Sequence, residues 1–370
     1  MTLISARRLL GPSGLVEGWV EVVSDRVAAW GEGRPGADPD LVVDVVCPGF
    51  VDVHSHGGGG ANFCSDPAQV RQVLAAHASH GTTTMVASLM TGPLDDMAEQ
   101  ARHLSAFVAD GSLAGIHLEG PWLAESYKGA HPASLLLDPK IPDISRLLEA
   151  GGPAVRTVTL APERPGGLDA VRFVSERGVV VAVGHTAADY DTTCQGIEAG
   201  ARGATHLFNA MPEILHRAPG PGLALWRDPR VWVELICDGI HVHPALIAHV
   251  MATKPDKAVL VTDAMAGAGC HDGDYTLGEL PVEVRGGVAR LAGASTIAGS
   301  TLTLDRAVRT AVAAGVDPVT ALRAATSNPA DYLGLKDVGR IEQGAWADLV
   351  CLTDDLVPIH VMRHGEWINP

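Results

Sequence analysis

Eight short apolar runs recur between residues 47 and 265 and alternate with segments of helical periodicity. The runs read CPGFVDVHSH, TTTMVASLM, LAGIHLEG, VRTVTLAPE, GVVVAVGHT, GATHLFNAM, VWVELICDGIH and AVLVTDAM. Apolar runs separated by helix-forming segments such as PAQVRQVLAAHASH predict parallel strands connected by helices. Eight such units are typical of an α/β fold of the TIM-like (β/α)8 barrel type, whose active sites lie at the C-terminal ends of the strands.

Candidate metal ligands stand at the downstream ends of five of these runs. They are His54, His56, Glu119, His185, His206 and Asp263. An open, doubly wound sheet also alternates strands and helices, but it lines its ligands along a crevice. Ligands from five strands that surround one point favour a closed barrel.

Each candidate also has an ordinary structural interpretation when it is taken alone. A single core histidine is often a hydrogen-bonded structural group, Asp263 can cap a strand end, and Glu119 can form an ion pair beneath a loop. In VDVHSHG, however, His54 and His56 alternate on an extended segment, so both imidazoles point to one side of the strand. The joint placement of all six ligands at one barrel end favours a cation site.

The two ends of the chain differ from this central pattern. Residues 1–46 and residues 338–370 contain short alternating strands, and together they predict one small β-sandwich domain built from both termini. Residues 47–337 are predicted to form the barrel, with a hairpin insertion at about 275–300.

Composition limits the partners of this chain. The formal net charge is −16, which argues against nucleic acid and against an anionic membrane surface, because both require basic patches. The six cysteines are scattered without a CxxC pair, MTLISARRLL lacks the apolar core of a signal peptide, and no uncharged apolar run reaches the length of a membrane span. These features predict a cytoplasmic protein with reduced thiols.

Several motifs resemble those of the N-acetylglucosamine-6-phosphate deacetylases of the amidohydrolase superfamily. The matching segments, in order from about residue 47 to 310, are PGFVDVHSHG, HLEGPW followed by KGAH, VTLAPE, GHTAA, GATHLFNAM followed by RAPG, DGIHVH, VTDAM and AGSTLTLDRAV. The terminal IEQGAWADLV is similar to the segment with which the superfamily returns to its β domain. VDVHSH and TDA occur throughout the superfamily, whereas HLEGPW, KGAH and HLFNAM are more specific.

The resemblance implies one or two divalent metal ions per subunit. Glu119, His185 and His206 match the main site, and His54 and His56 match the pair that holds a second ion in some members. Glu119 would bridge two ions, since the fourth run ends in LAPE and offers no bridging lysine. Such ligands suit Zn²⁺ best, and they also accept Fe²⁺, Co²⁺ or Mn²⁺.

The resemblance also implies roles for the remaining site residues. Asp263 matches the general base that becomes the general acid, and His131 in KGAH matches a histidine that polarises the acetyl carbonyl. The residues that match substrate contacts are Asn209 and Ala210 for the sugar, His241 for the phosphate, and Arg217, which reaches the phosphate from the other subunit of a homodimer. From the residues alone, His131 and Arg217 are loop residues and Asn209 is a turn residue.

The implied reaction is hydrolysis of N-acetyl-D-glucosamine 6-phosphate to D-glucosamine 6-phosphate and acetate, in amino-sugar catabolism and cell-wall recycling. Three alternatives remain at this point. They are the deacetylase of the N-acetylgalactosamine isomer, a cyclic amidohydrolase of the dihydroorotase or hydantoinase type, and a catalytically inactive barrel scaffold. HLEGPW, KGAH and HLFNAM argue against the second alternative, and the complete ligand set argues against the third.

Overall fold

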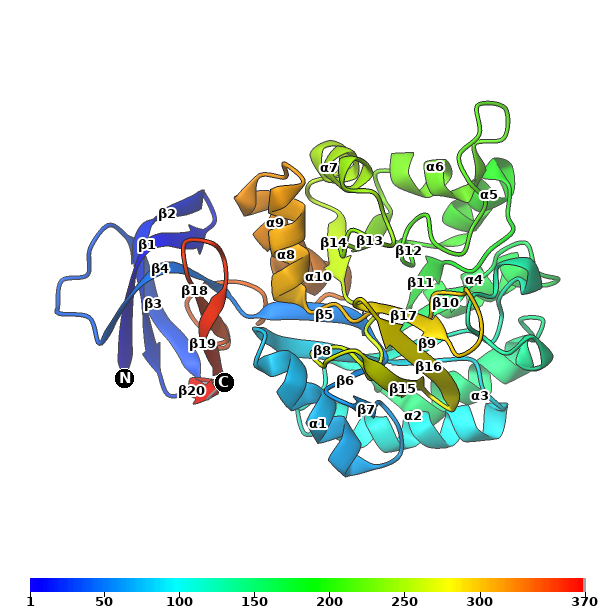
Figure 1. The fold of residues 1–370 in the computed structure, drawn as a ribbon, viewed down its shortest axis with the longest axis horizontal. Coiled ribbons are helices and arrows are strands. Elements are labelled where there is room, and N and C mark those ends of the chain that lie inside the picture. The colour runs from blue at the N-terminus through cyan, green and yellow to red at the C-terminus, as the bar shows by residue number, and fades with distance from the viewer. Residues whose placement is uncertain (369–370) are drawn as a thin grey trace.

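The computed structural model describes residues 1–368, and a closed (β/α)8 barrel forms the centre of that part of the chain (Figure 1). Its eight parallel strands follow one another around the barrel in chain order. They are β5 (Phe50–Ser55), β8 (Thr82–Leu89), β9 (Gly115–Glu119), β10 (Val155–Leu160), β11 (Val180–Val183), β12 (Gly203–Ala204), β13 (Trp232–Ile236) and β14 (Ala258–Val261). Each predicted apolar run contains one strand, so the predicted barrel is confirmed.

The barrel closes between β14 and β5. The backbone N–H of Asp263 donates to the carbonyl of His54 at 2.8 Å, and the N–H of His56 donates to the carbonyl of Ala264 at 2.8 Å. The Thr262 hydroxyl donates to the buried Asp52 carboxylate at 2.5 Å. This closure places the first and the last predicted metal ligands side by side.

Helices surround the barrel on its outer face (Figure 1). They are α1 (Pro67–Ala78), α2 (Leu94–Ala109), α3 (Ile141–Gly151), α4 (Gly167–Ser175), α5 (Tyr190–Ala199), α6 (Gly220–Arg227), α7 (Pro244–Thr253), α8 (Leu304–Ala313), α9 (Pro318–Ala324) and α10 (Ser327–Tyr332). Helix α1 shows how the sequence sets such an element. Asp66 caps its N-terminus by accepting from the N–H of Ala68, Pro67 occupies the first turn, and Val70 and Val73 face the core.

The predicted small β domain formed by both ends of the chain is confirmed. Its strands are β1 (Thr2–Gly11), β2 (Gly14–Val23), β3 (Arg26–Glu32), β4 (Leu41–Pro48), β18 (Leu349–Leu352), β19 (Pro358–Arg363) and β20 (Glu366–Ile368). They form one continuous sheet that encloses its own apolar core, and the antiparallel pairing of β4 with β18 joins the two ends. The division of the chain at residues 46 and 338 stays a prediction.

A small antiparallel sheet occupies most of the interval 275–300, for which a hairpin was predicted. It has three strands, β15 (Gly273–Leu277), β16 (Leu280–Arg285) and β17 (Val288–Leu291). Its apolar side chains pack against Met265, Met90 and Ala130. The sheet therefore lies beside the C-terminal mouth of the barrel, where the site is located.

Among residues 1–368, no helix is long and apolar enough to cross a membrane.

Candidate metal centre and active site

Three of the predicted ligands stand immediately beyond a strand in a left-handed backbone conformation. The φ angles are 46° for His185, 30° for His206 and 47° for Asp263. Residues with a Cβ rarely adopt this region, and such conformations cost of order 1–3 kcal/mol and cluster at functional sites. These residues follow β11, β12 and β14, so the turns place their side chains at the barrel mouth.

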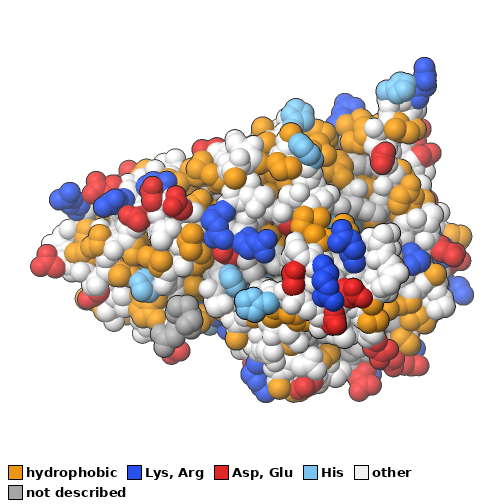
Figure 2. All heavy atoms as spheres, viewed as in Figure 1, with side chains coloured by type: hydrophobic (Ala, Val, Ile, Leu, Met, Phe, Trp, Pro, Cys, Tyr) orange, Lys and Arg blue, Asp and Glu red, His pale blue; other side chains and the backbone are white. Residues whose placement is uncertain are grey.

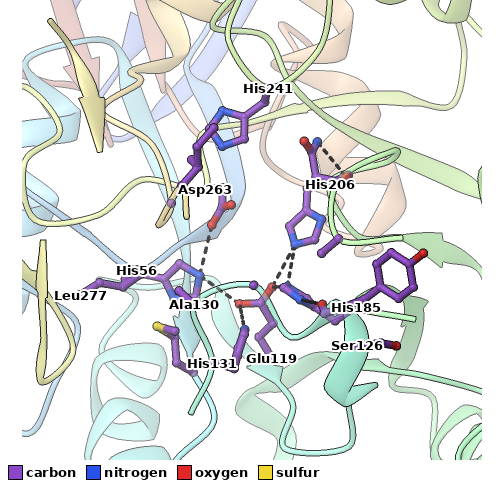
Figure 3. A pocket seen from close by; sticks show the side chains of 17 residues that line it. His56, Glu119, Ser126, Ala130, His131, His185, His206, His241, Asp263 and Leu277 are labelled. Carbon is purple, nitrogen blue, oxygen red and sulfur yellow. Dashed lines mark hydrogen bonds and ion pairs between the residues drawn. The ribbon is translucent and has the colours of Figure 1, made fainter. Parts of the chain in front are cut away.

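Glu119, the last residue of β9, lies at the centre of the cluster (Figure 3). Its Oε1 atom lies 3.2 Å from His185 Nε2 and 3.3 Å from His206 Nε2. Its Oε2 atom lies 3.2 Å from His56 Nε2. One carboxylate therefore contacts imidazoles from three different strands or strand ends.

Asp263 forms a second cluster with the histidine pair of β5. Asp263 Oδ1 lies 3.2 Å from His56 Nε2 and 3.4 Å from His54 Nε2, and the two Nε2 atoms are 3.3 Å apart. These three residues form a candidate metal-binding group. Because His56 also contacts Glu119, the two clusters are adjacent.

The hydrogen bonds at Nδ1 set the tautomers of three of the candidate metal-binding histidines. Three imidazoles face pure acceptors at this atom: His54 faces the Glu234 carboxylate at 3.0 Å, His56 the Ser88 carbonyl at 3.2 Å, and His185 the Tyr127 carbonyl at 2.8 Å. Each Nδ1 therefore carries the hydrogen, and each Nε2 offers its lone pair to the cluster. Lone pairs that face one another and carboxylates repel, so a cation fits between them.

His131 has the opposite arrangement. The backbone N–H of Thr91 points at His131 Nδ1 at 3.4 Å, and the Thr91 hydroxyl lies 2.8 Å from the same nitrogen. Nδ1 is therefore an acceptor, and Nε2 carries the hydrogen 3.5 Å from Glu119 Oε2. Although His131 lies close enough to group with Glu119 and His185, this tautomer makes it a hydrogen-bond donor in the cavity rather than a metal ligand.

The electrostatics of the cluster favour positive charge. Burial lowers the pKa of His56, but hydrogen bonds to Asp263 and Glu119 outweigh it and raise the pKa to about 9. Burial raises the pKa of Glu119, but the surrounding histidines, first His54, hold it well below its usual range. A bound metal ion would replace the protons that these groups otherwise hold.

A cavity of about 320 Å³ lies over the cluster and contains the predicted sugar and phosphate contacts, Asn209, Ala210 and His241. The Asn209 amide also donates to the carbonyl of His206 at 3.1 Å, as in a turn. His241 Nδ1 lies 2.7 Å from Asp238 Oδ2. Burial lowers the pKa of His241, but Asp238 outweighs it and raises the pKa, which favours the cationic form.

Two predicted site residues do not line the cavity: His54, which is fully buried beside Asp263, and Arg217, which lies away from the cluster. Arg217 is exposed near the end of the loop between β12 and α6, where Leu215 and Ala218 exchange backbone hydrogen bonds of 3.1 and 3.2 Å. This loop projects from the body of the protein (Figure 1), and basic and histidine side chains cover its tip (Figure 2).

Sequence reasoning missed two buried groups beneath the cluster. Glu234 on β13 contacts His54, and His117 on β9 lies between Ser88 Oγ at 2.9 Å and Thr159 Oγ1 at 2.7 Å. A signal was present, because both are polar residues inside apolar runs, VWVELIC and LAGIHLEG. A polar group inside a strand that is buried on both faces needs a partner.

A closed barrel with buried imidazoles and carboxylates gathered at its C-terminal mouth defines the class: this is the arrangement of a metal-dependent hydrolase. The model of the Amidohydrolase family matches residues 45–368. The chain therefore belongs to the amidohydrolase family.

Two deacetylases of amino-sugar phosphates are similar to this chain over most of its length. The N-acetylgalactosamine-6-phosphate deacetylase of Escherichia coli O157:H7 is 36% identical, and the match covers 99% of this chain and 98% of that protein. The human N-acetylglucosamine-6-phosphate deacetylase is also 36% identical, over 88% of this chain and 83% of that protein.

Solved structures of two deacetylases have the same fold as this chain. A mutant N-acetyl-D-glucosamine-6-phosphate deacetylase from Mycobacterium smegmatis, in complex with N-acetyl-D-glucosamine-6-phosphate, is 48% identical with a TM-score of 0.96, covering 99% of this chain and 98% of that one. The N-acetylglucosamine-6-phosphate deacetylase of Thermotoga maritima is 31% identical with a TM-score of 0.89, covering 99% of both chains.

Proposed function

We propose that this chain is a metal-dependent deacetylase that converts N-acetyl-D-glucosamine 6-phosphate and water to D-glucosamine 6-phosphate and acetate, within amino-sugar metabolism. One observation carries the proposal. A single cavity combines inward-facing imidazole lone pairs around Glu119, a buried Asp263 carboxylate, and the N–H donor of His131. The relatives named for this reaction support it.

Glu119, His185 and His206 would hold the main ion, and His54 and His56 with Asp263 would hold a second. Zn²⁺ suits these imidazole and carboxylate donors best, with Fe²⁺, Co²⁺ and Mn²⁺ as alternatives. A divalent cation bound here lowers the pKa of a water toward ~7 and polarises the substrate carbonyl.

The residues of the chain perform the proton transfers. Asp263 takes a proton from the attacking water as its oxygen bonds to the carbonyl carbon. Asp263 then gives that proton to the nitrogen as the C–N bond breaks, so the amine leaves in a neutral form. The Nε2–H of His131 donates to the carbonyl oxygen, where negative charge develops.

The cavity walls would hold the sugar phosphate. Asn209 and the backbone of Ala210 would bind the sugar hydroxyls, and His241, whose pKa Asp238 raises, would bind the phosphate. The negative net charge of the chain provides no general attraction for an anion, so these local contacts carry the recognition.

Arg217 would complete the phosphate site from the partner subunit of a homodimer. It follows two exposed apolar residues, Ile214 with 42% and Leu215 with 55% of its surface accessible. Exposed apolar side chains on a projecting loop favour contact with another chain.

A cytoplasmic location agrees with the six free cysteines of the described chain.

The test is direct measurement of products from purified, metal-loaded protein. We expect acetate and D-glucosamine 6-phosphate in equal amounts from N-acetyl-D-glucosamine 6-phosphate. The galactosamine epimer is assayed in parallel, because one relative is named for it, and dihydroorotate and hydantoin serve as ring-opening controls. Failure to release acetate from N-acetyl-D-glucosamine 6-phosphate would overturn the proposal, and acetate from the epimer alone would favour the galactosamine alternative.

A further inference from the structure

A second cavity of about 550 Å³ adjoins the catalytic cavity. The two cavities share His56, Met90 and Leu277 in their walls. The second cavity lies among the start of α2, the short 3-10 helix Ala133–Leu135, and the turn between β15 and β16. The two cavities are therefore adjacent, and these three side chains form the boundary between them.

In the orientation that the proposed function implies, the acyl group of the substrate would face the second cavity. This orientation of the acyl group rests on the proposed function, which directs the carbonyl oxygen toward His131 and the nitrogen toward Asp263, with the sugar beside His241. The remaining substituent of the carbonyl carbon then points away from His241. Figure 3 shows Leu277 on the side of the site opposite His206 and away from His241, where the two cavities meet.

Apolar and neutral polar side chains both line the second cavity. The apolar ones include Phe63, Leu89, Met90, Pro93, Met97, Pro132, Leu135, Leu277 and Leu280, and the neutral polar ones are Asn62, Gln69, Ser88, Thr91, Gln100 and Thr276. Among the described residues that line it, the charged or metal-site side chains are Asp96, Glu279 and His56. Two carboxylates without a lysine or arginine in this lining disfavour an anionic chain, whereas a neutral hydrocarbon chain gains from burial.

We infer that the enzyme accepts neutral N-acyl groups longer than acetyl, with propanoyl and butanoyl chains extending into the second cavity. The chemistry is unchanged. Water oxygen bonds to the carbonyl carbon, the C–N bond breaks, and the nitrogen receives the proton. The products are D-glucosamine 6-phosphate and propanoate or butanoate.

The experiment compares kcat/KM for N-acetyl-, N-propanoyl- and N-butanoyl-D-glucosamine 6-phosphate with the metal-loaded protein. A site closed behind the methyl group would lose at least about tenfold for each added methylene. The second cavity instead predicts that the butanoyl substrate stays within about tenfold of the acetyl substrate, with a gain of up to about fourfold for each methylene that is fully buried.

Two variants test whether the acyl chain of the substrate lies in the second cavity. Leu135→Trp narrows the second cavity, and Leu136→Trp places the same bulk on a neighbouring residue that lines neither cavity. The ratio of butanoyl to acetyl kcat/KM should fall at least about tenfold in the first variant and stay unchanged in the second. Leu280→Phe narrows the same cavity from β16 and serves if Leu135→Trp does not fold.

The outcomes separate the two proposals. Hydrolysis of the acetyl substrate with a loss of more than about tenfold for butanoyl would overturn this inference and leave the proposed function standing. A site closed behind the methyl group predicts a loss of about a hundredfold, which is about tenfold for each of two methylenes. A ratio that falls equally in Leu135→Trp and Leu136→Trp would also overturn it. Absence of acetate release would instead defeat the proposed function.

Discussion

His54 donates its Nδ1 hydrogen to the buried Glu234 carboxylate at 3.0 Å, and the same carboxylate oxygen accepts the backbone N–H of His206 at 3.3 Å. Glu234 is 1% exposed. One residue on β13 thus fixes the tautomer of a ligand on β5 and the backbone of a ligand beyond β12. Partners of this kind hold metal ligands in orientation.

Glu234→Gln should therefore weaken metal binding by about ten- to a hundredfold, because the amide holds the His54 imidazole less strongly and removes a charge. Competition with a chelator of known affinity measures the effect. Glu283→Gln, an exposed carboxylate on β16, is the control and should bind metal normally. Wild-type affinity in Glu234→Gln would show that the contact does not orient His54.

Asp263→Asn should reduce kcat by at least about a thousandfold, because the amide cannot accept the proton of the attacking water. Metal at Glu119, His185 and His206 should remain, which elemental analysis of the purified variant checks. The exposed Asp256→Asn is the control. Retained turnover in Asp263→Asn would remove this residue from proton transfer.

Replacing His54 and His56 together with Asn should remove one metal position and keep the other. Both imidazoles contact Asp263, whereas His185 and His206 contact Glu119 independently of them. Equilibrium dialysis should then give one ion for each chain instead of two. An unchanged stoichiometry would argue against two separate positions.

Arg217→Ala should raise KM for the phosphorylated sugar about ten- to a hundredfold, the cost of losing a hydrogen bond between charged groups. The unphosphorylated sugar should show little change. Equal effects on both sugars would contradict a role in phosphate binding.

Subunit mixing tests whether Arg217 acts across an interface. In a heterodimer of Arg217→Ala and Asp263→Asn chains, the site of the first chain keeps Asp263 and receives Arg217 from its partner. At substrate concentrations well below the wild-type KM, random exchange should restore about a quarter of wild-type activity. No recovery, with heterodimers demonstrated by mass, would place Arg217 outside the partner's site.

His77 should make stability fall at acidic pH. Burial in α1 lowers its pKa to about 4 from 6.5, despite its hydrogen bond to the Gly57 carbonyl at 2.9 Å. Between pH 4 and 6.5 the unfolded chain binds more protons at His77 than the folded chain does. The contribution of neutral His77 to the free energy of unfolding is therefore complete above pH 6.5 and is lost on acidification toward pH 4. The loss amounts to about 3 kcal/mol.

The measurement is urea unfolding of metal-loaded protein between pH 4.5 and 7.5. His77→Gln keeps a donor for Gly57 but does not titrate, so its stability should fall less steeply toward acid than that of the wild type. Parallel curves for the two proteins would show that another group causes the loss.

The sequence could predict that the strand-end side chains gather at one place, because barrel geometry brings the C-terminal ends of parallel strands together. It did not predict which tautomer each imidazole adopts, since the partners of His56 and His185 are backbone carbonyls of distant residues. Backbone groups have no signature in the sequence. Only the fold shows that His131 donates into the cavity while His185 offers a lone pair.

The length of one barrel strand could not be predicted from the sequence. The run GATHLFNAM forms only the two-residue strand β12, because the chain turns at His206, and Leu207 and Met211 are buried outside the sheet. The third strand at 273–291, in contrast, had a signal. Gly286 and Gly287, with φ of 59° and 74°, form the two-residue turn between β16 and β17 that such a glycine pair favours.

Anomalous diffraction from a crystal of the Asp263→Asn variant with N-acetyl-D-glucosamine 6-phosphate tests the central claim most directly. We predict an anomalous peak about 2.0–2.2 Å from a Glu119 oxygen and from the Nε2 atoms of His185 and His206, with the acetamide carbonyl between that peak and His131. A fully metal-loaded crystal without a peak at Glu119, or with the sugar phosphate bound elsewhere, would contradict it.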